Sequence, residues 1–276
     1  MKKLLKQIDQ FKFPVNEVNK ENWFTIQPTR YFKFGSKQIL ISQPLSSFLV
    51  YLLGILAILA AIPFLRHEGD LSKIWWGIAL LLWGVGALLA GTSYQAFGFQ
   101  IKCEGRDVCR WTSWWEVIYM IFQQLSMDAI LLALAYSSAD GPSRKWILLV
   151  SAVIALSYIV LVLFGAFKPN KTLISFEFMV LYSLPGLLLS LCLNSWNYFQ
   201  TGATLELALI YTWLSLIAIG FSYSWYLKLN ISQKLWSRHL LGRKIWFTEN
   251  DVLHVTLIFW VVYIAIYLEP LVKDFY

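Results

Sequence analysis

The sequence predicts an all-α integral membrane protein: a bundle of seven transmembrane helices with a cytosolic N-terminus and an outer C-terminus. Three observations carry this prediction: the composition, the length of the apolar segments and the distribution of basic residues. Of 276 residues, 58% are hydrophobic and 14% are charged, whereas a soluble domain has about 25% charged residues. The mean hydropathy is +0.58. We therefore expect a multi-pass membrane protein.

Seven apolar segments are long enough to cross a bilayer, which takes about 20 residues in a helix. Their expected bounds are 40–65, 74–97, 114–136, 146–167, 173–195, 204–227 and 250–268. The chain then divides into a basic N-terminal segment, residues 1–39, and a seven-helix transmembrane domain, residues 40–276.

The connections between these segments differ in their content of Lys and Arg. Alternate connections, counted with the N-terminal segment, carry 18 of the 23 basic residues, and the remaining connections and the C-terminal tail carry five. The positive-inside rule places the basic set, including the N-terminus, in the cytosol. The net charge of +7 follows from this asymmetry and from contact with anionic lipids, so no nucleic-acid partner is expected.

Two basic segments have the pattern of interfacial helices. In Met1–Phe13 the apolar residues fall on one helical face, namely Leu4, Leu5, Ile8 and Phe11. The loop 228–249 mixes Leu235, Trp236, Leu240 and Leu241 with basic residues. Such segments lie on a membrane surface. The expected partners are membrane lipids, and the aromatic richness is also suited to a membrane-protein partner or an oligomer.

Ionisable and amide side chains within the spans are the candidate functional residues, because they are costly at membrane depth. The predicted orientation brings Gln95, Glu116, Glu177, Tyr223, Asp251 and His254 to one level in the cytosolic half of the bilayer. The candidate ligand cavity is lined by Ser93, Gln95, Glu116, Gln123, Gln124, Asp128, Glu177, Tyr223 and Asn250. Asp251 and His254, three residues apart on one helical face, are the candidate catalytic pair.

Each candidate also has a purely structural interpretation. Thr248 and Asp251 have the spacing of a capping box, and His254 can be a neutral side chain bonded to a neighbouring helix. Glu116 and Glu177 can reach water at the interface. Gln123 and Gln124 can join helices by hydrogen bonds, and Asp128 must face the bundle, pair with a neighbour or be protonated.

Cys103 and Cys109 share one connection on the predicted cytosolic side. We expect two reduced thiols there, because cytosolic proteins rarely keep disulfides. A disulfide or half of a metal site is the alternative.

The sequence Gly91-Thr-Ser93-Tyr-Gln-Ala-Phe97 at the end of the second span, with seven spans and a cytosolic N-terminus, resembles the CREST superfamily of membrane hydrolases. This group includes the alkaline ceramidases and adiponectin receptors. The resemblance implies an intramembrane zinc ion, held by Ser-x3-His, an Asp on the next span and His-x3-His on the last span. In this sequence the fourth residue after Ser93 is Phe97, where the family has His. Glu116 is the nearest candidate for the family's Asp, and Asn250-x3-His254 stands where the family has His-x3-His on the last span.

A three-histidine zinc site is excluded, because His67 and His239 lie in connections and only His254 lies in a span. Catalytic zinc usually takes three protein ligands, so a zinc or other divalent-metal site would combine His254 with Asp251 and Glu116. The resulting expectation is a cytosol-side cavity between the second, third and seventh spans that binds a lipid or similar apolar ligand. Hydrolysis of a lipid amide or ester is one version, with a water positioned by metal or Asp251 and His254 as ligand or base.

Two alternatives stay open. A small-molecule or ion carrier would use Glu116, Asp128, Glu177 and His254 as a polar route. A structural subunit of a larger membrane assembly would need no such route.

Overall fold

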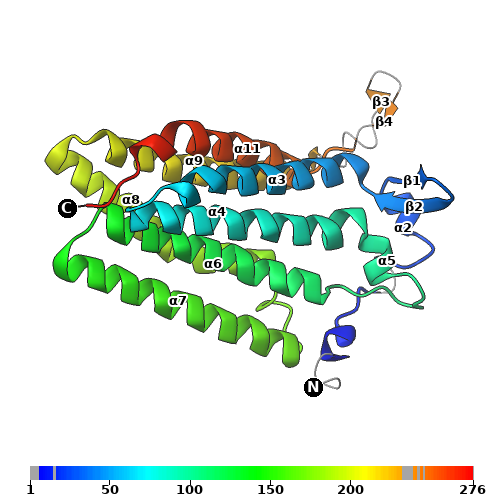
Figure 1. The fold of residues 1–276 in the computed structure, drawn as a ribbon. Coiled ribbons are helices and arrows are strands. Elements are labelled where there is room, and N and C mark those ends of the chain that lie inside the picture. Colours follow the sequence, from blue (N-terminus) through cyan, green and yellow to red (C-terminus); the bar gives the residue numbers. More distant parts are fainter. Residues whose placement is uncertain (1–5, 15–16, 232–238, 241–242, 245, 276) are drawn as a thin grey trace.

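A computed structural model describes residues 6–14, 17–231, 239–240, 243–244 and 246–275. Seven helices in this part of the chain are long and apolar enough to cross a membrane, which confirms the predicted seven-span architecture. The N-terminal region and the C-terminus lie at opposite ends of the bundle (Figure 1), as an odd number of spans requires.

The spanning helices follow the predicted segments closely. They are α3 (Pro44–Arg66), α4 (Leu71–Ala90) with the π-helical η2 (Gly91–Ala96), α6 (Trp114–Ser137), α7 (Gly141–Phe167), α8 (Phe176–Thr201), α9 (Thr204–Lys228) and α11 (Glu249–Tyr263) with η3 (Ile264–Leu268) and η4 (Glu269–Leu271). The first span begins at Pro44 and not near residue 40, because a strand occupies the preceding residues. Pro185 lies inside α8, and the helix continues through it.

The bundle has an inner and an outer set of helices. The most apolar stretches of α4 and α6 are 56% and 61% buried, whereas those of α7 and α8 are 22% and 17% buried. The inner helices carry the main core, in which Trp76 stacks on Trp213 and Trp83 lies against Trp260. The outer helices present most of their apolar surface outward, where lipid would contact them.

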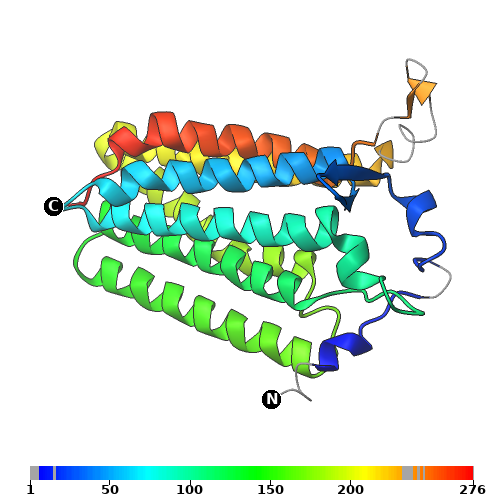
Figure 2. The ribbon, with the colours of Figure 1, turned by 45° about the vertical axis from the view of Figure 1, so that its right-hand side comes forward.

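A cap of short elements covers the end of the bundle that holds the N-terminal region. It consists of η1 (Lys6–Gln10), α2 (Trp23–Ile26), the antiparallel hairpin of β1 (Thr29–Phe34) and β2 (Lys37–Ser42), and α5 (Gly98–Lys102). Figure 2 shows the hairpin and α2 at this end, beside the start of α3. Two further short strands, β3 (His239–Leu240) and β4 (Arg243–Lys244), pair in the long loop before α11.

The N-terminal segment docks on the bundle, which differs from the predicted surface helix. Ile8 and Phe11 are 2% and 3% exposed and pack against α6, α7 and the start of α8. The backbone N–H of Trp111 donates to the carbonyl of Phe11, and that of Phe13 donates to Cys109. The apolar face of this segment is therefore satisfied by protein. Leu4 and Leu5, and the apolar residues of the 228–249 loop that include Leu235, Trp236 and Leu241, fall outside the described residues or side chains.

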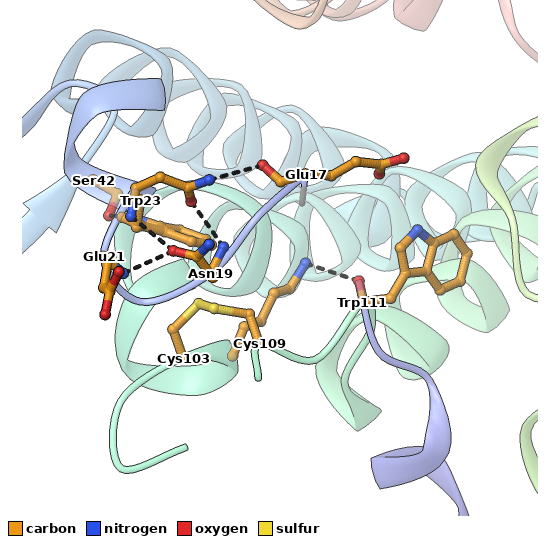
Figure 3. The surroundings of a disulfide bond; sticks show 10 residues. Glu17, Asn19, Glu21, Trp23, Ser42, Cys103, Cys109 and Trp111 are labelled. Carbon is orange, nitrogen blue, oxygen red and sulfur yellow. Dashed lines mark hydrogen bonds between the residues drawn. A yellow bond between two sulfur atoms is a disulfide. The ribbon is translucent and has the colours of Figure 1, made fainter. Parts of the chain in front are cut away.

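Cys103 and Cys109 form a disulfide (Figure 3), so the prediction of two reduced thiols is wrong. The chain reverses between them, since the N–H of Arg110 donates to the carbonyl of Lys102, and this brings the two Cα atoms to 4.3 Å. Both cysteines are fully buried and pack with Trp23 and Phe99. The disulfide closes a short loop within the connection between α5 and α6, and Trp23 of the N-terminal segment packs against it.

Candidate ligand cavity

A cavity of about 430 Å³ lies within the bundle, toward the end that carries the N-terminal cap. Its apolar lining consists of Val50, Leu53, Trp83, Ala87, Ala90, Met127, Phe176, Met179, Val180, Leu181, Leu184, Leu187, Leu216, Ile219, Gly220, Leu253 and Leu257. Its polar lining consists of Tyr119, Gln123, Glu177, Ser183, Tyr223, Ser224 and His254. Small-molecule sites have this size and this mixture of an apolar wall with few polar groups.

Six spanning helices build the cavity wall: the first half of α3, the end of α4, the first half of α6, the first half of α8, the end of α9 and the start of α11. These parts of the helices lie at the same end of the bundle, because consecutive spans run in opposite directions (Figure 1). Four of the predicted residues meet at the cavity, namely Gln123, Glu177, Tyr223 and His254.

His254 lies on the cavity wall without the hydrogen bond that its structural interpretation requires. Its side chain is 8% exposed, and its Nδ1 has no hydrogen-bond partner among the described residues. A buried polar atom without a partner costs free energy unless a ligand or water satisfies it. Protein atoms cover this nitrogen, so it is an unpaired group inside the cavity wall and not a surface that a ligand would touch.

The wall formed by α8 is open to the outside of the bundle. Val180, Leu181 and Leu184 line the cavity and are 43%, 63% and 38% exposed. In a membrane this surface faces acyl chains. A ligand dissolved in the bilayer could enter between these side chains.

A second polar cluster lies apart from the cavity, under the N-terminal cap. The Ser93 hydroxyl donates to Oε1 of Glu116 at 2.7 Å, and Lys102 Nζ lies 2.6 Å from the same oxygen. Ser113 shares a 2.7 Å hydrogen bond with Ser93. Glu116 is 1% exposed and Lys102 is 5% exposed, so this is a buried ion pair. Ser93 and Glu116 were expected to line the ligand cavity, but they lie outside its lining and contact each other and Lys102.

The start of α11 forms the predicted capping box. The Thr248 N–H donates to Oδ2 of Asp251 at 2.6 Å, and the Thr248 hydroxyl donates to the same oxygen at 3.1 Å. Asp251 is fully buried and does not line the cavity. Asn250, in the same turn, is also outside the cavity lining. The candidate catalytic pair is therefore divided between a helix cap and a cavity wall.

Asp128 and Gln124 form a third polar group, deeper in the bundle. Gln124 donates to Oδ1 of Asp128 at 3.2 Å and accepts from the Ser183 hydroxyl at 2.8 Å. Ser183 also lines the large cavity. Oδ2 of Asp128 lacks a hydrogen-bond partner in the described part of the chain, and Asp128 and Gln124 both line a small void. Gln95 is buried in η2 and outside the cavity lining.

The predicted metal ligands do not gather at one point. Within the described residues, no group of three His, Cys, Asp or Glu side chains could hold a metal ion. Glu116 is engaged by Lys102, and one oxygen of Asp251 is engaged by the helix cap.

Several contributing residues were missed from the sequence. Tyr119, Ser183 and Ser224 complete the polar wall of the cavity, although Tyr and Ser are too common in spans to stand out.

At the opposite end of the bundle, Asn194 donates to Glu206 at 2.6 Å and accepts from the Trp213 indole at 2.7 Å. That network joins α8 to α9. The sequence could have indicated it, because an amide near the end of one span is followed by a carboxylate near the start of the next.

The fold and the cavity define the class of protein: a multi-pass integral membrane protein with a seven-helix bundle that encloses a mainly apolar cavity. A scan against protein-family models finds no match, and searches of curated proteins and of solved structures find none either.

Proposed function

We propose that this protein binds a lipid or a similar amphipathic molecule in the intramembrane cavity. The observation that carries the proposal is the cavity itself, about 430 Å³ in volume, with an apolar wall and polar groups on the ends of α8, α9 and α11. An acyl chain would lie among the leucines of α8 and α9, with its polar head toward Tyr223 and His254. The resemblance to CREST membrane proteins points to the same class of ligand.

The arrangement supports binding more directly than hydrolysis or ion transport. Hydrolysis by the expected pair would need Asp251 on the cavity wall, and Asp251 instead caps α11. A polar route through the bundle would need Glu116 and Asp128 in the same space as Glu177. Neither lines the cavity.

Gly220 provides a test of ligand binding. It lines the cavity, and a Cβ built at this position meets no atom within 4 Å. Gly220→Phe should therefore fill cavity space without a clash with the backbone. We expect at least a tenfold loss of long-chain lipid that copurifies with the protein, measured by mass spectrometry of the extracted lipid.

Ala218→Phe is the matched control, because Ala218 lies on the same helix, is exposed and does not line the cavity. This variant should retain the lipid of the wild-type protein. Equal lipid content in both variants, with both proteins monodisperse, would contradict the proposed cavity ligand.

A further inference from the structure

We propose that the head of the ligand is cationic, an amine or a quaternary ammonium group. This inference rests on the proposed binding function and adds the charge of the ligand. It follows from the charged and aromatic groups at the end of the cavity where α8 begins and α9 ends.

The only fully charged side chain in the described cavity lining is the Glu177 carboxylate. Glu177 is exposed, so it lies where the cavity opens to the outside of the bundle. A cationic head at this opening would be attracted to the carboxylate.

Aromatic rings surround the same point. Phe176 and Tyr223 lie with ring centroids 5.7 Å apart, and Tyr119 is a third aromatic residue of the cavity wall. All three line the cavity. A cation within about 6 Å of such a ring is attracted to the negative π-face, and a carboxylate head is not.

Basic groups that could receive an anionic head are missing from this wall. Neither Lys nor Arg lines the cavity in the part of the chain that the structure describes. The neighbouring buried cation, Lys102, is already paired with Glu116 at 2.6 Å. An anionic head would therefore meet no positive charge on this wall and would be repelled by the Glu177 carboxylate.

His254 lines the same cavity as Tyr223 and is more than nine-tenths buried. Its Nδ1 has no hydrogen-bond partner among the described residues, but protein atoms cover this nitrogen. The groups that would recognise a cationic head are therefore the Glu177 carboxylate and the aromatic rings.

The test compares three ligands with the same chain and different heads: hexadecylamine, hexadecanol and hexadecanoate. Dissociation constants are measured on the full-length protein in a neutral detergent at neutral pH, where the amine is protonated. We expect the wild-type protein to bind the amine about tenfold more tightly than the alcohol, equivalent to about 1.4 kcal/mol. Hexadecanoate should bind more weakly than the alcohol.

Glu177→Gln should reduce the preference for the amine over the alcohol to about twofold or less, and a melting temperature equal to that of the wild type shows that the variant is folded. Glu104→Gln is the control, because Glu104 is an exposed acid at the same end of the protein that does not line the cavity. It should keep the full preference.

Three outcomes would overturn the inference. Equal binding of the three ligands, or a full preference for the amine in Glu177→Gln, would refute the cationic head and leave the proposed cavity intact. Failure of all three ligands to bind, together with equal lipid content in Gly220→Phe and the wild type, would refute the binding function as well.

Discussion

At the scale of single residues, Glu116 shows what the position of a residue along a predicted span can and cannot establish. Its position predicts burial near the cytosolic end of a span, and it is 1% exposed. Its partner, Lys102, comes from α5, outside the spanning helices, and points back into the bundle. Lys side chains are long enough to place the charge far from their Cα, so hydropathy alone does not reveal the pair.

Removing one member of this pair should be costly. Lys102→Met leaves the Glu116 carboxylate buried and unpaired, and we expect a loss of about 3–5 kcal/mol in the free energy of unfolding. The measurement is reversible unfolding in mixed micelles. The double variant Lys102→Met, Glu116→Gln should recover most of the loss, because no buried charge remains. A single variant as stable as the wild type would show that Glu116 has another partner.

At the scale of helices, α3 and α4 are held together by a close backbone approach. A Cβ added to Gly84 would lie 2.6 Å from the carbonyl oxygen of Gly54, and one added to Gly54 would lie 2.9 Å from that of Gly84. Small residues at such crossings let membrane helices pack closely. Because the obstacle is backbone, it cannot rotate away as a side chain could.

Gly84→Ala should therefore destabilise the protein by about 1–3 kcal/mol, the usual cost of overpacking. Gly86→Ala is the control on the same helix, because its nearest contact would be an ordinary 3.6 Å. Gly86→Ala should be neutral or slightly stabilising, since alanine favours helix. Thermal unfolding of both variants in one detergent measures the difference, and equal melting temperatures would show that the two helices can separate without cost.

The spanning helices were predictable, and the cap at the end of the bundle was not. A bilayer demands long apolar helices, so composition alone locates α3 to α11 within a few residues. The β1–β2 hairpin has exposed residues on both strands, among them Tyr31 at 69% and Phe32 at 39%, and it lacks the alternation that signals a strand. Docking of Ile8 and Phe11 depends on tertiary contacts.

At the scale of the whole molecule, the sequence predicted the level of the candidate residues along the spans, but not the side of each helix that faces the cavity. Counting residues along each span placed Glu177, Tyr223 and His254 at one level, and they share the cavity. The same counting placed Glu116 and Asp251 at that level, but they face other neighbours. Helix rotation depends on packing between helices, which a single sequence without repeats does not specify.

The placement of the whole molecule across the membrane is indicated by two features that disagree. The basic residues favour a cytosolic location for the end that carries the N-terminal cap. The Cys103–Cys109 disulfide at that same end is typical of an oxidising compartment. Both can hold if burial shields the disulfide, since both cysteines are 0% exposed. In that case the folded protein resists reduction, and the disulfide is reduced only on denaturation.

Labelling of single cysteines introduced at the two ends of the molecule decides whether the basic residues or the disulfide indicate the orientation correctly. With Cys192 replaced by Ala, Ser36→Cys lies at the exposed turn of the β1–β2 hairpin and Glu68→Cys lies in the exposed loop between α3 and α4. A membrane-impermeant maleimide applied to intact cells should label Glu68→Cys, whereas Ser36→Cys should react only after permeabilisation. The reverse pattern would mean that the disulfide, and not the basic residues, reports the orientation. The cavity would then open toward the outer half of the bilayer, and its ligand would come from that leaflet.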